Sequence, residues 1–103
     1  MNIKIYGFGS FFQGAETFND IDLLIIHDSN DYTSCLDAIS LKMELISKFD
    51  NAHITMLSNS EEFQLNFIEK SEAFLIGFYF QVEKEDIVSE IEFKIKNMLN
   101  RHG

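Results

Sequence analysis

The chain has 103 residues, of which 46% are hydrophobic and eleven are phenylalanine, and its formal net charge is −9. This length and composition predict one folded domain over residues 1–103, and the lack of an apolar run of roughly 20 residues excludes a membrane helix. Because the eight basic residues are scattered among seventeen acidic ones, long nucleic acid is excluded as a partner, whereas a basic protein or a metal-chelated small phosphate is favoured.

Two strands and a short helical turn are predicted in the first quarter of the chain. Residues 3–8 form a first strand, which glycines bring to an end. Residues 10–14 form a short helical turn with Ser10 as its N-cap. Residues 20–27 form a second strand, whose four consecutive aliphatic residues are typical of a strand covered on both faces.

A long helix follows the second strand. After a loop over residues 28–31, apolar residues recur at helical spacing and predict a helix over residues 32–48. The side of this helix that we expect to face the core consists of Tyr32, Cys35, Leu36, Ile39, Met43 and Ile46.

The second half of the chain continues the alternation of strands and helices. A third strand is predicted over residues 51–57, and a helix over 58–70 opens with a serine and a glutamate at the spacing of a capping box. A fourth strand is predicted over 73–82, and an apolar stripe over 87–99 predicts a last helix. The sequence therefore predicts an α/β (α+β) fold, a small mixed sheet of about four strands with helices packed on it.

The fourth strand contains more apolar residues than one buried face requires. Phe74, Phe78 and Phe80 accompany Leu75 and Ile76 in this stretch. The excess indicates either a strand that other elements cover or a surface on which two copies of the chain associate.

Two aspartates precede the aliphatic run of the second strand. Side chains alternate along a strand, so Asp20 and Asp22 point to the same face. Unpaired like charges at the head of a buried strand are costly, and a divalent cation between them removes that cost. Mg²⁺ commonly uses one or two protein carboxylates together with substrate phosphates. Gly9 and Ser10 complement this pair, because glycine permits close backbone approach to a phosphate and the following turn presents N–H groups to an anion.

This combination resembles the nucleotidyltransferase fold, in particular the minimal nucleotidyltransferase (MNT) family. That family has a hydrophobic-Gly-Ser step, a gap of about nine to thirteen residues, and Asp-hydrophobic-Asp followed by aliphatic residues. The matching stretches are Phe8-Gly9-Ser10 and Asp20-Ile21-Asp22-Leu23-Leu24, and Gly14 fits a further glycine that the family often has. Residues 67–76 look like the closing helix and strand of the family, so the resemblance covers residues 3–76.

The resemblance implies transfer of a nucleoside monophosphate from an NTP, with ATP expected, to an acceptor hydroxyl. Asp20 and Asp22 would hold Mg²⁺, while Gly9 and Ser10 would bind the triphosphate. Bacterial MNT proteins of this size are often antitoxins encoded beside a helical HEPN-type toxin, a ribonuclease that they silence by attaching AMP to a tyrosine or by binding it. The acidic surface suits such a nucleic-acid-binding, basic partner.

The sequence departs from the family pattern at two places. Active members have a third carboxylate on the next strand, where this chain has His53 unless Asp50 takes the place through a different strand register. His53 is either a general base or an inert, hydrogen-bonded residue. If it ligated the ion instead, a preference for Mn²⁺ or Zn²⁺ would follow. The turn after Ser10 has Phe11-Phe12-Gln13 where the family often has a basic residue, and the two phenylalanines are interpreted as core anchors or a partner-binding surface.

Two functions from different classes therefore remain. The first is a small Mg²⁺-dependent nucleotidyltransferase with Asp20, Asp22 and His53 as its catalytic residues, and the second is a catalytically degenerate binding module that acts on a partner protein by contact alone. His27 is interpreted as a solvated strand end, and Cys35 as a small core residue. A single cysteine and the lack of a signal-peptide pattern lead us to expect a cytoplasmic protein.

Overall fold

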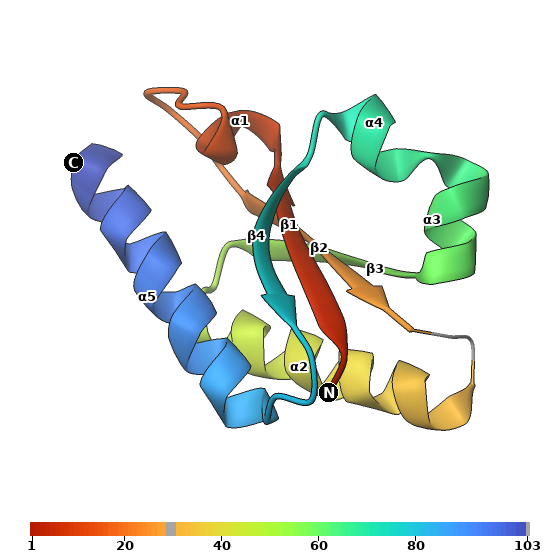
Figure 1. Ribbon diagram of the computed structural model, residues 1–103. Coiled ribbons are helices and arrows are strands. Elements are labelled where there is room, and N and C mark those ends of the chain that lie inside the picture. The colour runs from red at the N-terminus through yellow and green to blue at the C-terminus, as the bar shows by residue number, and fades with distance from the viewer. Residues whose placement is uncertain (29–30, 103) are drawn as a thin grey trace.

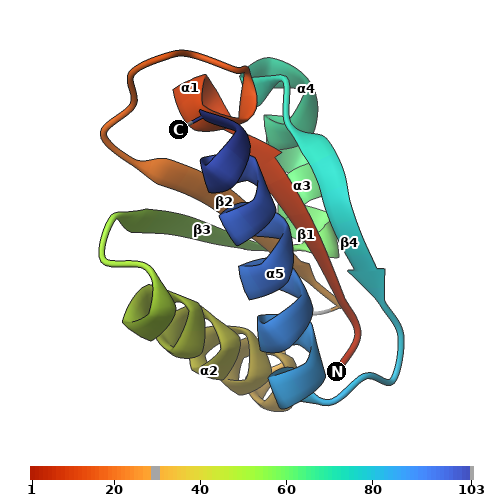
Figure 2. The same ribbon diagram turned by 90° about the vertical axis from the view of Figure 1, so that its left-hand side faces the viewer.

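The computed structural model describes residues 1–28 and 31–102, which form one four-stranded mixed sheet with helices on both faces (Figures 1 and 2). The strands are β1 (Ile3–Phe8), β2 (Ile21–His27), β3 (Ala52–Ser58) and β4 (Phe74–Tyr79). The helices are α1 (Gly9–Phe12), α2 (Tyr32–Lys48), α3 (Asn59–Leu65), α4 (Phe67–Ser71) and α5 (Lys84–His102). The predicted α/β (α+β) class is confirmed.

The strand order in the sheet is β3-β2-β1-β4. The central strand β1 runs antiparallel to both β2 and β4, while β2 and β3 are parallel. The start of β2 and the start of β3 therefore lie at the same end of the sheet as the end of β1. This end contains the turn and the aspartates that the sequence singled out.

The two faces of the sheet differ in how they are covered. On the helix face, α2 and α5 pack against the sheet, and α5 crosses it in the front of Figure 2. The main core there includes Ile3, Ile5, Ile21, Leu23, Ile25, Ala38, Leu41, Leu45, Ile87, Ile91 and Ile95. On the opposite face, here called the open face, a smaller cluster consists of Leu24, Ile26 and Leu57, with Tyr6, Phe8, Phe67 and Ile68 packed against it. Alternation along β2 thus buries both of its faces, as its aliphatic run predicts.

The predicted core side of α2 is wrong. The helix buries Ala38, Leu41 and Leu45, whereas four of the predicted residues are exposed. These four, here called the α2 stripe, are Tyr32, Leu36, Ile39 and Met43. The helix is apolar on two sides, and helical spacing alone does not decide which side meets the sheet.

Several predicted bounds and caps also differ from the structure. The residue before α1 is Phe8, whose side chain cannot accept a hydrogen bond, so Ser10 lies inside the turn and is not its N-cap. The predicted helix over 58–70 is two helices, because Asn66 adopts a left-handed conformation with φ 54° between α3 and α4. The fourth strand ends at Tyr79. Of the predicted loop over 28–31, residues 29–30 lie outside the described part of the chain.

The capping box at the start of α3 is confirmed. The Ser58 hydroxyl accepts a hydrogen bond from the Glu61 amide at 3.1 Å, and the Ser58 amide donates to Glu61 Oε1 at 2.9 Å. Hydrogen bonds from Ser58 are the main reason that the pKa of Glu61 is lowered from its usual value. Acidic side chains in this first turn also favour the positive end of the helix.

The edge strand β4 depends on a glycine in its middle. A side chain at Gly77 would overlap the phenol ring of Tyr79, which folds back over the glycine and is 5% exposed. Burial, together with the nearby Glu90 carboxylate, raises the pKa of Tyr79 well above its usual range. Lys94 of α5 donates to the Ile76 carbonyl at 2.6 Å and pairs with Glu90 at 2.9 Å, which holds α5 to this strand. In the described part of the chain, none of the helices has the length and apolar character needed to span a bilayer.

Candidate functional site

The end of β1 and the starts of β2 and β3 bring a turn, a carboxylate and an imidazole together. In the strand register Phe8 lies opposite Asp22, and Asp22 lies opposite His53. Gly9 directly follows Phe8 and begins α1, so the Gly-Ser turn emerges beside Asp22. All of these residues lie at one end of the sheet. Together we call them the Gly9–Asp22 site.

Gly9 and the Asp22 carboxylate are in direct contact. Gly9 has φ +80°, a conformation that side-chain-bearing residues rarely adopt, and a methyl group on its Cα would overlap the carboxylate of Asp22. Two independent restrictions, one from the backbone and one from the carboxylate, therefore favour glycine here. The close approach also means that a group bound by the turn would lie next to Asp22.

His53 is the neighbour of Asp22 on the other side. Its Nδ1 lies 3.5 Å from Asp22 Oδ1, and the two side chains are 76% and 21% exposed. The register that makes His53 the counterpart of the expected third carboxylate is the observed one, and Asp50 precedes β3 and does not take that place. The imidazole is thus accessible to a bound molecule as well as close to Asp22.

Asp20 and Ser10 are the other two predicted site residues. Asp20 is exposed and immediately precedes β2, whose first amide, that of Ile21, donates to the Asn51 carbonyl at 2.9 Å. Ser10 is exposed in the first turn of α1. The fold thus places Asp20 at the same end of the sheet as Asp22 and the turn.

The side chains of the site suit a hard cation only when a substrate supplies further oxygen ligands. Within the described residues, no group of three or more His, Cys, Asp or Glu side chains is placed to hold a metal ion. Two carboxylates are nonetheless the number that Mg²⁺ commonly takes from a protein when phosphate oxygens and water complete its shell. The residues present therefore fit a nucleotide-bound Mg²⁺ better than an ion held by the protein alone.

The hydrophobic residues of the turn serve the core. Phe11 is 1% exposed, and its ring meets those of Phe12 and Phe18 edge-on at centroid distances of 4.9 and 4.7 Å. Phe12 also contacts Phe74 of β4 at 5.6 Å. The interpretation of the two phenylalanines as core anchors is confirmed. They fix the turn against the sheet.

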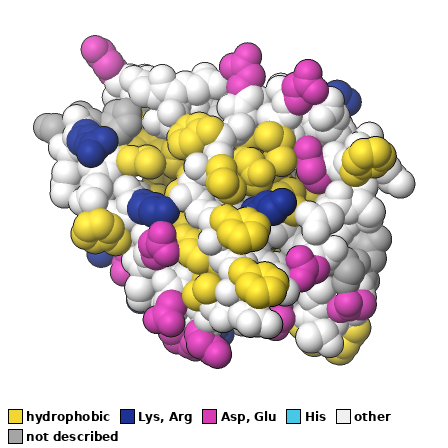
Figure 3. Space-filling view, viewed as in Figure 1, with side chains coloured by type: hydrophobic (Ala, Val, Ile, Leu, Met, Phe, Trp, Pro, Cys, Tyr) yellow, Lys and Arg dark blue, Asp and Glu magenta, His cyan; other side chains and the backbone are white. Residues whose placement is uncertain are grey.

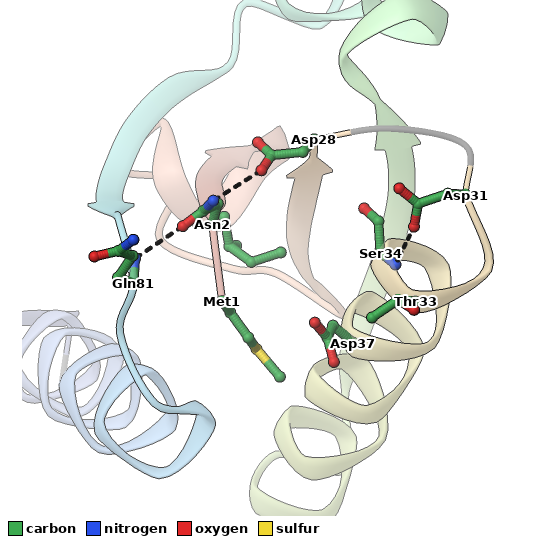
Figure 4. Close-up of a pocket in the computed structure, with 9 residues that line it drawn as sticks. Met1, Asn2, Asp28, Asp31, Thr33, Ser34, Asp37 and Gln81 are labelled. Atoms are coloured by element: carbon green, nitrogen blue, oxygen red, sulfur yellow. Dashed lines mark hydrogen bonds between the residues drawn. The ribbon is translucent and has the colours of Figure 1, made fainter.

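Acidic side chains gather at the opposite end of the strands as well. A hollow of about 360 Å³ lies there, lined by Met1, Asn2, Ile3, Asp28, Asp31, Thr33, Ser34, Asp37 and Gln81 (Figure 4). The Asn2 side-chain amide donates to Asp28 Oδ2 at 2.9 Å, and Asp31 Oδ1 accepts from the Ser34 backbone amide at 2.8 Å as the N-cap of α2. These two carboxylates already have donors from the protein, and the sequence motif does not include them.

His27 was misjudged from the sequence. It is 4% exposed, and its Nδ1 lies 3.0 Å from the Ser34 hydroxyl. It ends β2 inside the fold, so the interpretation as a solvated strand end is wrong. Its position directly after four buried aliphatic residues was the available signal. Cys35 is partly buried in α2.

Comparison of the chain with protein-family models, with curated proteins and with solved structures finds no match.

Proposed function

We propose that the Gly9–Asp22 site binds a nucleoside triphosphate with Mg²⁺, ATP being the expected nucleotide, and transfers its nucleoside monophosphate to an acceptor hydroxyl. The observation that carries this proposal is the contact between the Asp22 carboxylate and the Gly9 backbone. A carboxylate that holds a cation and a glycine turn that receives phosphate must be neighbours for such chemistry, and here they touch.

Each residue of the site has a distinct role in this proposal. Asp20 and Asp22 supply oxygen ligands to the cation, which neutralises the phosphate charge and orients the triphosphate. The Gly9 and Ser10 amides and the Ser10 hydroxyl receive phosphate oxygens. His53 accepts the proton of the acceptor hydroxyl as its oxygen bonds to the α-phosphorus and pyrophosphate leaves.

The acceptor that we propose is a hydroxyl on a partner protein. The resemblance to MNT antitoxins suggests a HEPN-type toxin in the cytoplasm, and the net charge of −9 favours a basic partner. The site lies at an exposed end of the sheet, with His53 open to solvent, which suits an acceptor too large to enter an enclosed pocket.

The binding step is tested by thermal unfolding with ATP and Mg²⁺ or Mn²⁺. A ligand that binds only the folded state raises the free energy of unfolding by about 2.7 kcal/mol at a hundredfold excess over its dissociation constant. We expect a rise in melting temperature for the wild type that Asp22→Asn abolishes. Asp50→Asn, an exposed aspartate outside the site, is the matched control and should retain the rise. Equal rises in all three proteins, or none in the wild type, would contradict the proposal.

The transfer step needs the partner. Incubation of the chain and Mg²⁺ with ATP labelled at the α-phosphate, together with the product of the neighbouring reading frame, should move label to that partner. His53→Ala should slow the transfer more than it weakens nucleotide binding, because a general base contributes typically 10²–10⁴-fold to rate.

The second candidate function is a binding module that no longer transfers nucleotides. Two observations favour it: an imidazole occupies the place of the third carboxylate, and the turn after Ser10 is committed to the core through Phe11. Loss of one preorganised stabilising group can cost 10²–10³ in rate. Inhibition of the partner without any transfer of label would decide for this candidate.

A further inference from the structure

The edge strand β4 presents apolar side chains to solvent. It is the last strand in the sheet order, so only its β1 side is paired within the described residues. Leu75 is 51% exposed and Phe78 is 61% exposed on the open face, while Phe80, just beyond the strand, is 63% exposed. Figure 3 shows hydrophobic side chains gathered in the middle of the face that β4 crosses. An uncovered apolar edge is a template for pairing with another strand.

We propose that β4 is the interface of a symmetric dimer, in which the β4 strands of two copies of this chain pair antiparallel along their free edges. The sequence left open whether this strand is covered or self-associating, and no helix or strand covers its outer edge in the described part of the chain. The proposal is independent of nucleotide binding, because the Gly9–Asp22 site involves other strands.

The strand is complementary to itself. A bulge in the pairing of β1 with β4 places both Leu75 and Phe78 on the open face, opposite Tyr6 and Lys4 respectively. A two-fold axis near Gly77 therefore sets Leu75 of one copy against Phe78 of the other on the same face. Directly opposed aromatic and aliphatic side chains stabilise antiparallel pairs. No charged residue lies between Phe74 and Tyr79, so this pairing opposes no like charges.

Two basic side chains lie beside the apolar residues of the strand. Lys4 Nζ lies 5.9 Å from the centre of the Phe78 ring, and Lys94 lies at the bulge with its amine on the Ile76 carbonyl. In Figure 3 dark blue side chains stand among the apolar ones, and most acidic side chains lie toward the margin of this face. In a two-fold dimer this surface meets the same surface of the other copy, so these lysines only offset part of the repulsion between two chains of net charge −9.

The exposed area indicates a weak dimer. From the exposed fractions of Phe74, Leu75, Phe78 and Phe80, the side chains offer roughly 400 Å² per copy, about half of a standard interface. Because Lys94 occupies the carbonyl at the bulge, we assign the new backbone hydrogen bonds to the residues on either side of it. We therefore expect association that depends on concentration in the micromolar range or above.

The test is sedimentation velocity of the full chain between about 1 µM and about 1 mM, a range that covers weak and standard interfaces. The wild type should shift from one to two times 12.0 kDa as concentration rises. Phe78→Lys should raise the dimer dissociation constant at least tenfold. Its unchanged near-ultraviolet circular dichroism should show that the fold is intact, since the Phe78 side chain is mostly exposed.

The α2 stripe supplies the matched control. Met43 is 62% exposed on α2, so Met43→Lys introduces the same charge into another apolar surface, and this variant should dimerise like the wild type. A wild type that remains monomeric throughout the range would overturn the proposal. Dissociation caused by Met43→Lys and not by Phe78→Lys would also overturn it. Slower hydrogen exchange of β4 amides at high concentration would support strand pairing, and unchanged exchange in a dimer would count against it.

Discussion

Two glycines with nearly the same positive φ flank the turn after β1. Gly9 has φ +80° and contacts the Asp22 carboxylate, whereas Gly14 has φ +82° and no heavy atom within 4 Å of the place a Cβ would take. Substitutions at these two positions therefore separate the loss of folding stability due to the backbone conformation from the loss due to displacing Asp22.

Alanine substitutions at these two glycines should differ in a defined way. Each should lose about 1–2 kcal/mol for the left-handed conformation, and Gly9→Ala should lose more because its methyl group overlaps the carboxylate of Asp22. Urea unfolding measures both losses. Gly14→Ala should also keep the ATP-dependent rise in melting temperature, and Gly9→Ala should not. Equal losses with the rise kept in both variants would show that the Gly9–Asp22 contact is unimportant for binding.

Much of the site could be predicted from single residues. The motif led us to expect that the Gly-Ser step and Asp22 meet, and the antiparallel pairing of β1 with β2 is what brings them to the same end of the sheet. Alternation along the third strand singled out His53 in the same way. The distance from His53 to Asp22 and the exposure of the imidazole depend on side-chain packing, which spacing does not encode. The burial of His27 was missed although four aliphatic residues directly precede it.

At the scale of single elements, α3 depends on its capping box. Ser58→Ala should cost about 0.5–2 kcal/mol of folding stability at pH 7, as measured by urea unfolding. Because the pKa of Glu61 is lowered in the folded state, its carboxylate stabilises the fold above the ordinary value of 4.5, and that contribution is lost as pH falls through the folded pKa. Glu61→Gln should therefore lose less stability than the wild type does between pH 7 and pH 3. Parallel losses in the two proteins would contradict the role assigned to Glu61.

The elements that were predicted correctly and incorrectly differ in how many signals support them. The start of α3 has a box of two reciprocal hydrogen bonds, and β2 has an unbroken aliphatic run, so each was located within a residue or two. The helix α2 is apolar on two sides. Packing against the sheet buries Leu41 and Leu45 and leaves Leu36 and Met43 exposed. The break at Asn66 was missed because asparagine tolerates the left-handed conformation but does not require it, so its presence alone does not predict a helix end.

For the whole molecule, charge connects the proposed activity with the proposed assembly. A net charge of −9 opposes the approach of a triphosphate, so nucleotide binding should require the divalent cation. The same charge makes two copies repel each other, and Lys4 and Lys94, which lie beside the apolar side chains of β4, offset part of that repulsion at this face. The site end of the sheet and the β4 edge are separate surfaces, so a dimer can leave both copies of the Gly9–Asp22 site accessible.

Paramagnetic broadening by Mn²⁺ in the presence of ATP, read from amide resonances of the labelled chain, tests the central claim most directly. Acidic side chains lie near both ends of β1, and these ends are roughly 17 Å apart. The broadening therefore shows at which end the ion binds. We expect strong broadening at Gly9, Asp22 and His53, and its loss in Asp22→Asn. Broadening centred on Asp28 and Asp37 at the opposite end, or none beyond that of free Mn²⁺, would contradict it.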